Sequence, residues 1–249
     1  MNIVLFDLGS TLIYFNGPRP EAVARSRQAL ADSLEQAGFH LDRDAFLEAF
    51  NTSDAEYSRK RENENLEFTS LFILKEQIKS LGYTDGDDSV LQRALDDMYA
   101  VTQEIWQPED DALPVIKELT ERGYRLGIIS NAADDNDVQT LVDKLGARQY
   151  FDIVISSAAA GIRKPNPEIF HMALNHWQAS PSQAVMVGDR LDADILGAHN
   201  CMMPGIWITR RIDPGDDQSS IEKIQPDQTI ATLAELPGVL SKYGEINKK

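Results

Sequence analysis

The sequence of 249 residues has little cysteine and no long apolar run. Its single cysteine, Cys201, excludes an intrachain disulfide and a metal site built from several thiolates. No stretch approaches the roughly 18 consecutive apolar residues of a membrane-spanning helix. The N-terminus enters an apolar segment at once, without the basic region and cleavage site of a signal peptide. These features lead us to expect a cytoplasmic protein with no membrane partner.

Basic residues are also scarce, since 24 lysines and arginines face 40 aspartates and glutamates, for a net charge of −16. A nucleic-acid polymer is therefore not an expected partner, because phosphate backbones are bound by clustered basic side chains. A small phosphorylated substrate remains compatible with this charge, since a metal ion and one or two local cations can neutralise it. We expect a monomer or a homodimer.

The second part of the chain alternates between apolar strands and amphipathic helices. Strands are predicted at the N-terminus after residue 2 and at residues 125–129, 152–156, 184–188 and 205–209. Helices are predicted at residues 110–123, 137–145, 167–175, 192–200 and 233–240. Such alternation is typical of a parallel sheet covered by helices on both faces, and it predicts an α/β fold with a Rossmann-like core.

The region between the first strand and this alternation is helical throughout. Four amphipathic helices are predicted, at residues 21–37, 44–62, 69–81 and 89–105, with no strand among them. We therefore predict a helical-bundle domain at residues 16–106, inserted into a catalytic core that comprises residues 1–15 and 107–249.

Polar side chains follow several predicted strands, where open α/β sheets place their chemistry. Asp7 ends the first strand and is our candidate nucleophile for phosphoryl transfer. Asp189 follows a later strand, and with Asp7 it can bind Mg²⁺, which prefers oxygen ligands. Lys164 supplies a positive charge for the phosphate and for Asp7. Ser130, together with the backbone N–H of Asn131, can donate hydrogen bonds to the phosphate.

The order and context of these residues resemble the haloacid dehalogenase-like hydrolase superfamily, whose members share a Rossmann-like core. The similarity lies in residues 6–12, 128–131, 161–170 and 185–198. The resemblance implies that Asp7 is the nucleophile, that Ser130 and Lys164 bind phosphate, and that Asp189 binds Mg²⁺. It further implies that Asp194 supports the metal site and that Thr11 orders the loop around Asp7. The helical insertion corresponds to the family's cap.

Gly9 departs from the family's phosphatase pattern, which has a second aspartate at this position as general acid and base. The backbone carbonyl of Gly9 can still bind Mg²⁺, but the roughly 10²–10⁴-fold contribution of a general acid is lost. Dehalogenases and phosphonatases of the family also lack this acid. Dehalogenases of the family work without metal and lack the arrangement of Asp189 and Asp194. Phosphonatases of the family need a lysine in the cap. The candidates for that lysine are Lys60, Lys75 and Lys79.

The sequence thus predicts a Mg²⁺-dependent hydrolase that acts on a small phosphorylated metabolite, a nucleotide or a sugar phosphate, through an aspartyl-phosphate. The alternatives are a catalytically poor binding or regulatory protein and a dehalogenase-type or phosphonatase-type hydrolase. Cap residues are expected to select the substrate. The basic candidates are Arg25, Arg59, Lys60 and Arg61.

Overall fold

The computed structural model describes residues 1–83, 87–212 and 223–246. Its centre is a six-stranded sheet in the order β5-β4-β1-β6-β7-β8, and all neighbouring strands are parallel. The strands are β1 (Ile3–Phe6), β4 (Arg125–Ser130), β5 (Phe151–Ser156), β6 (Ala184–Gly188), β7 (Gly205–Ile208) and β8 (Gln228–Ile230). The predicted α/β class is confirmed, and β8 is a strand that the sequence pattern did not predict.

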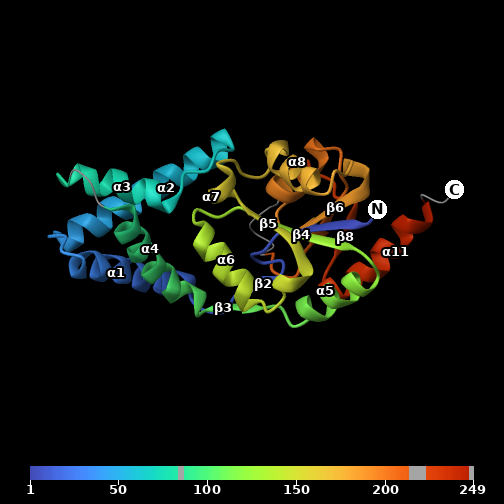
Figure 1. The fold of residues 1–249 in the computed structure, drawn as a ribbon, viewed down its shortest axis with the longest axis horizontal. Coiled ribbons are helices and arrows are strands. Elements are labelled where there is room, and N and C mark those ends of the chain that lie inside the picture. Colours follow the sequence, from blue (N-terminus) through green and yellow to red (C-terminus); the bar gives the residue numbers. More distant parts are fainter. Residues whose placement is uncertain (84–86, 213–222, 247–249) are drawn as a thin grey trace.

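Helices cover both faces of this sheet (Figure 1). Val4 and Phe6 of β1 face one helical layer, whereas Ile3 and Leu5 face the other, because neighbouring residues of a strand point to opposite sides. The first layer contains α5 (Ala112–Glu121), α6 (Asp135–Lys144) and α11 (Leu236–Ile246). The second contains α8 (Pro167–His176) and α9 (Leu196–Asn200). Shorter helical segments are α7 (Ser157–Ala160), Arg148–Tyr150, Pro181–Gln183, Leu191–Ile195 and Leu233–Glu235.

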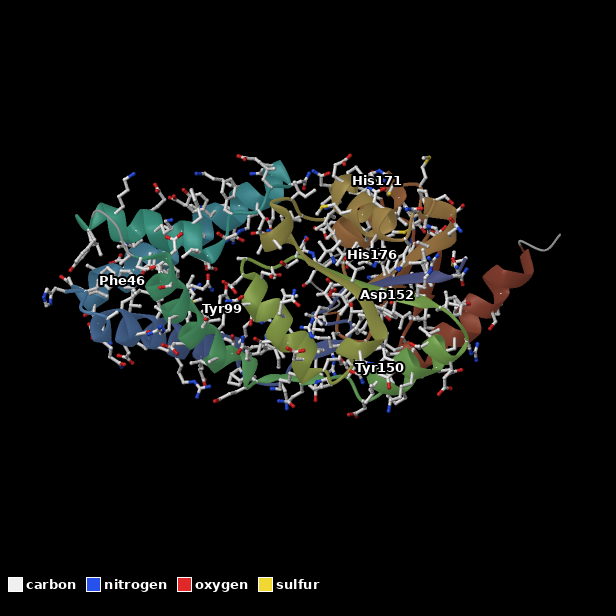
Figure 2. All side chains as sticks on the ribbon, viewed as in Figure 1. Phe46, Tyr99, Tyr150, Asp152, His171 and His176 are labelled. Atoms are coloured by element: carbon white, nitrogen blue, oxygen red, sulfur yellow. The ribbon has the colours of Figure 1, made fainter. Side chains whose placement is uncertain are left out.

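Four helices follow the first strands and form a separate packed region, at the left of Figure 1. They are α1 (Arg19–Gln36), α2 (Arg43–Glu64), α3 (Ser70–Ser80) and α4 (Asp88–Gln103). Asp42 and Thr69 cap α2 and α3 by accepting hydrogen bonds from backbone N–H groups in the first turn. Phe46 lies in the apolar interior between the helices (Figure 2), and its side chain is 1% exposed. The predicted helical insertion is therefore confirmed.

The chain enters and leaves the helical region through two short paired strands. Strand β2 (Ile13–Phe15) lies antiparallel to β3 (Trp106–Pro108), with Phe15 opposite Trp106. Neither segment is predicted as a strand from the sequence pattern. Each has only three residues, too few for an alternation to be detected, and the pairing joins distant parts of the chain. Within the described ranges, no helix combines the length and apolar character that a membrane crossing requires.

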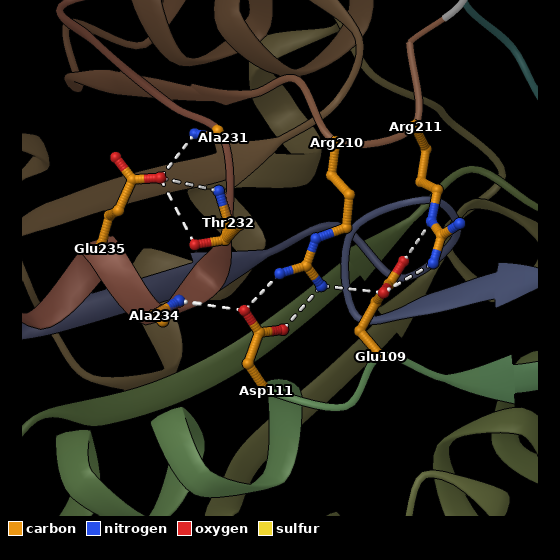
Figure 3. Close-up of polar contacts among 8 residues, drawn as sticks. All are labelled: Glu109, Asp111, Arg210, Arg211, Ala231, Thr232, Ala234 and Glu235. Atoms are coloured by element: carbon orange, nitrogen blue, oxygen red, sulfur yellow. Dashed lines mark hydrogen bonds and ion pairs between the residues drawn. The ribbon is translucent and has the colours of Figure 1, made fainter.

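An ion-pair network fixes the chain where it re-enters the sheet region after β3 (Figure 3). The buried carboxylate of Glu109 accepts hydrogen bonds from Arg210 at 2.8 Å and from Arg211 at 2.6 and 2.9 Å. Arg210 also binds Asp111, and the guanidinium of Arg211 lies 3.9 Å from the ring centroid of Tyr14. The segment after β7 is thereby tied to β2 and to the beginning of α5.

Candidate active site

The carboxyl ends of β1, β4 and β6 meet at a cavity of about 460 Å³, which the helical region helps to line. A volume of this size suits a small metabolite. All but one of the residues predicted for catalysis, phosphate binding and the metal site lie in its lining. Those residues are Asp7, Gly9, Ser130, Asn131, Lys164, Asp189 and Asp194.

Asp7 and Lys164 form a buried ion pair at the bottom of this cavity. The Nζ of Lys164 lies 2.7 Å from Oδ1 of Asp7, 2.6 Å from Oδ1 of Asp194 and 2.7 Å from the carbonyl oxygen of Ile129. Burial alone would lower the pKa of Lys164, but the carboxylates of Asp194 and Asp7 raise it above its usual value. The side chain therefore holds a fixed positive charge beside the carboxylate of Asp7.

Asn131 sets the position of the loop that bears Lys164. Its amide group donates to the backbone carbonyl of Lys164 and accepts from the backbone N–H of the same residue, each at 2.9 Å. Ser130, the last residue of β4, is 7% exposed and also lines the cavity. The Ser-Asn pair thus joins the end of β4 to the lysine loop.

Three carboxylates converge at the same place. One oxygen each of Asp7, Asp189 and Asp194 lies within 4.8 Å of the others. Gly188 permits this approach, because a Cβ at its position would lie 2.3 Å from the carboxyl group of Asp194. Asp194 also accepts a hydrogen bond from the backbone N–H of Arg190 at 3.0 Å. It lies in the π-helical turn Leu191–Ile195, where the sequence predicted a regular helix at residues 192–200.

The charge of this cluster matches the requirements of a divalent cation. Burial, together with the nearby charges of Asp7 and Asp194, raises the pKa of Asp189 to about 8. Lys164 is the one cation within ion-pair distance of these carboxylates among the described residues, so negative charge remains in excess. Hard dications prefer oxygen ligands of this kind. The donor set therefore fits Mg²⁺, with Asp7 and Asp189 as the side chains available to hold it.

Gly9 and Thr11 follow the nucleophile candidate and differ in their surroundings. Gly9 lines the cavity, and a Cβ at this position would lie 3.4 Å from Cη2 of the Trp106 indole ring. Thr11 is fully buried and lies outside the lining, and its hydroxyl has no hydrogen-bond partner among the described residues. An ordering role of Thr11 in the loop around Asp7 stays a prediction.

The cavity also contains residues that the sequence analysis did not identify. Those with charged or aromatic side chains are Arg19, Tyr99, Trp106, Asp137, Arg163 and Arg190. Tyr99 lies on α4 where the helical region faces α6 (Figure 2), and Asp137 accepts a hydrogen bond from Gln103 at 2.9 Å. Arg163 and Arg190 adjoin predicted site residues in the sequence, which was a usable signal. The others reach the cavity only through contacts between distant segments.

The basic cap residues chosen as substrate contacts were the wrong ones. None of Arg25, Arg59, Lys60 and Arg61 lies in the lining of the cavity. Arg25, Arg59 and Lys60 are exposed on the outer faces of α1 and α2. Arg61 is buried, but its guanidinium binds the carbonyl oxygen of Phe68 and pairs with Glu67 at 2.7 Å.

Comparisons with known proteins agree with this geometry. The chain is 28% identical over 247 residues to ribulose-1,5-bisphosphate 5-phosphatase of Halopiger xanaduensis. This alignment covers 96% of this chain and 98% of the relative. A solved 2-haloacid dehalogenase of Pseudomonas syringae pv. Tomato is similar, with 26% identity, a TM-score of 0.68 and coverage of 98% and 99% of the two chains. A solved HAD phosphatase of Thermococcus onnurineus has 25% identity and a TM-score of 0.64, over 96% and 98%.

The family itself is identified by a match to a family model. The model of the haloacid dehalogenase-like hydrolases matches residues 1–201, a range that contains every residue of the acidic cluster and the lysine loop. The chain therefore belongs to the haloacid dehalogenase-like hydrolase family.

Proposed function

We propose that this protein is a Mg²⁺-dependent phosphatase that hydrolyses a small phosphorylated metabolite through an aspartyl-phosphate on Asp7. The observation that carries the proposal is the convergence of Asp7, Asp189 and Asp194 around the buried ammonium group of Lys164. An anionic nucleophile can approach an anionic phosphate only where positive charge lies beside both.

The proposed reaction assigns each residue one task. The carboxylate of Asp7 attacks phosphorus in line with the leaving oxygen, the bond from phosphorus to that oxygen breaks, and the released alkoxide takes a proton from water. Lys164 neutralises charge beside Asp7. Ser130 and the backbone N–H of Asn131 donate hydrogen bonds to the phosphoryl oxygens. A Mg²⁺ ion bound by Asp7, Asp189 and the carbonyl of Gly9 would supply the remaining positive charge. Water then attacks the phosphorus of the aspartyl-phosphate, which releases phosphate and restores Asp7.

The substrate class follows from the cavity and from the relatives. We propose that residues 16–106 act as a cap over a catalytic core of residues 1–15 and 107–249, so that the substrate is enclosed. A cavity of about 460 Å³ excludes polymers and suits a metabolite. The full-length similarity to a phosphatase of a sugar bisphosphate favours sugar phosphates over nucleotides.

A dehalogenase is the second candidate, because one similar solved structure is a 2-haloacid dehalogenase and because Gly9 provides no acid. However, displacement of halide by Asp7 does not require the carboxylates of Asp189 and Asp194. Asp194 already pairs with Lys164, but burying Asp189 beside Asp7 and Asp194 without a further cation to bind would only destabilise the fold.

The direct test is hydrolysis of p-nitrophenyl phosphate with Mg²⁺, with excess chelator, and by the Asp189→Asn variant. We expect turnover that chelator and Asp189→Asn each abolish, and that added Mg²⁺ restores after chelation. The matched control is Asp192→Asn, a nearby carboxylate that pairs with Arg190 and lies outside the cavity lining.

Two results would contradict the proposal. Release of halide from a 2-haloacid at a rate unaffected by chelator would identify a dehalogenase. No turnover of any phosphate ester by folded, Mg²⁺-loaded protein would identify a binding or regulatory protein on this scaffold.

A further inference from the structure

Four cationic side chains line the cavity, and three of them have a carboxylate partner within the protein. Lys164 pairs with Asp7 and Asp194. The other two are Arg190, bound to Asp192 at 2.6 and 3.0 Å, and Arg163, whose Nη1 lies 3.6 Å from Glu67. Arg19 is the fourth, and it forms no ion pair with any described residue.

Aromatic rings hold the guanidinium of Arg19. Its central carbon lies 4.7 Å from the ring centroid of Phe15 and 5.5 Å from that of Trp106. These two rings pack edge to face at 5.3 Å, on the paired strands β2 and β3. Stacking uses the face of a guanidinium and leaves the N–H groups at its edge free to bind a planar anion.

The same rings connect Arg19 to the nucleophile loop. Trp106 contacts the position of Gly9, two residues after Asp7, and all four residues line one cavity. A Cβ at position 9 would lie 3.4 Å from the indole ring, which is an ordinary van der Waals contact. Trp106 therefore links Arg19 to the loop that follows Asp7, and the cation of Arg19 lines the same cavity as the nucleophile candidate.

The location of Arg19 is unfavourable for the helix it begins. Arg19 is the first residue of α1, where the helix dipole favours acidic side chains and disfavours cations. Its side chain has no carboxylate to offset this effect. A bound anion would provide that compensation, and the N-terminus of α1 would add to the attraction.

We infer that Arg19 binds a second anionic group of the substrate, so that the substrate carries a carboxylate or another phosphate besides the phosphoryl group that is transferred. This inference rests on the proposed phosphatase function. The second anion must lie on the same small molecule, because Arg19 and Asp7 line one cavity.

The test compares substrates that differ in the second anion alone. The first pair is 3-phosphoglycerate and glycerol 3-phosphate, and the second pair is ribulose 1,5-bisphosphate and ribulose 5-phosphate. A charge-assisted hydrogen bond should favour the doubly anionic member of at least one pair by about tenfold to a hundredfold in kcat/KM. The preferred pair shows whether the second anion is a carboxylate or a phosphate.

Variants of Arg19 then show which residue creates the preference. Arg19→Met should reduce the ratio of kcat/KM within the preferred pair to about one, and Arg19→Lys should retain part of it. The matched control is Arg25→Met, on the exposed face of the same helix and outside the cavity lining. Its ratio should equal that of the unchanged protein.

Binding separates this inference from the proposed chemistry. The same pairs are titrated calorimetrically, with Mg²⁺, into Asp7→Asn protein and into the Asp7→Asn/Arg19→Met double variant. Tighter binding of the doubly anionic member, lost in the double variant, supports the subsite even where turnover is absent. Equal affinities within both pairs, or a preference that survives Arg19→Met, overturn it, and Mg²⁺-dependent hydrolysis of p-nitrophenyl phosphate would then leave the phosphatase proposal intact.

Discussion

The ammonium nitrogen of Lys164 lies 2.7 Å from Oδ1 of Asp7, and both side chains are buried. The same nitrogen lies 2.6 Å from Asp194, so one lysine pairs with two of the three clustered carboxylates. Loss of this lysine would leave both carboxylates buried without a cationic partner. The site remains deficient in positive charge, which is the basis for its proposed affinity for Mg²⁺.

Replacing Lys164 by methionine should therefore destabilise the metal-free protein. Removing one partner of a buried ion pair leaves an uncompensated charge, and the free energy of unfolding should fall by about 3–5 kcal/mol. Chemical denaturation with chelator present measures this effect. Lys117→Met, at an exposed position of α5, should change stability by less than about 0.5 kcal/mol.

A second substitution tests whether Lys164 stabilises the fold through its charge. Adding Asp194→Asn to Lys164→Met should recover part of the lost stability, because it removes one of the carboxylates left without a partner. If the two substitutions destabilise additively, Lys164 does not stabilise the fold through its charge.

The pKa of Asp189 predicts proton release on metal binding. Burial and the charges of Asp7 and Asp194 raise this pKa from 3.8 to about 8. Between these pH values the folded, metal-free protein retains a proton that the unfolded chain has lost, so its stability decreases as the pH rises through this range. Mg²⁺ binding needs the ionised carboxylate and should release that proton below pH 8.

Calorimetric titration of Mg²⁺ in buffers of different ionisation enthalpy counts the protons released. At pH 6.5 we expect up to about one proton for each Mg²⁺ bound, and close to none at pH 9.5. Asp192→Asn should give the same counts, because the pKa of Asp192 is lowered and its carboxylate is already ionised at both pH values. Equal release at both pH values would contradict the assignment of Asp189 as a metal ligand.

Gly9→Asp tests the missing acid. A Cβ at position 9 meets Trp106 at 3.4 Å, an ordinary contact, so an aspartate can be accommodated. A general acid assists poor leaving groups most, and the rate for glycerol 3-phosphate relative to p-nitrophenyl phosphate should rise by at least about tenfold. Gly9→Asn has nearly the same shape without the acid and should give no such gain. A similar gain in both variants would rule out proton transfer as its cause.

Glu109 offers a test of the fold away from the chemistry. Its buried carboxylate accepts hydrogen bonds from Arg210 and Arg211 (Figure 3). Glu109→Gln removes the charge while keeping the shape, and it should lower the free energy of unfolding by about 1–3 kcal/mol. Glu118→Gln, which alters an exposed pair with Arg122, should have an effect below about 1 kcal/mol. Equal effects in thermal or chemical denaturation would show that the network contributes little to stability.

The sequence predicted much of this architecture because the relevant signals are local. Continuous apolar runs marked β1, β4 and β6, and amphipathic periodicity marked α1 to α4 within a few residues of their observed ends. Asp7, Ser130 and Asp189 were found because each stands at or next to the end of such a run. Parallel pairing then brings those ends to one edge of the sheet.

The parts that were missed depend on contacts between distant segments. Strands β2 and β3 have three residues each and are recognisable only through their pairing. Arg19 reaches the cavity because Trp106 is brought beside Phe15 by that same pairing. Arg25 and Arg59 were chosen for their charge, but helical periodicity alone could not show that they point away from the cavity.

The central claim is that the carboxylate of Asp7 receives the phosphoryl group. Acid quenching during turnover, followed by borohydride reduction, converts an aspartyl-phosphate to homoserine, and mass spectrometry of the peptide that contains residue 7 detects the change. We predict homoserine at position 7 in the presence of Mg²⁺ and substrate, and none when chelator replaces Mg²⁺. Rapid turnover with an unmodified residue 7, or modification of a different carboxylate, would contradict the account.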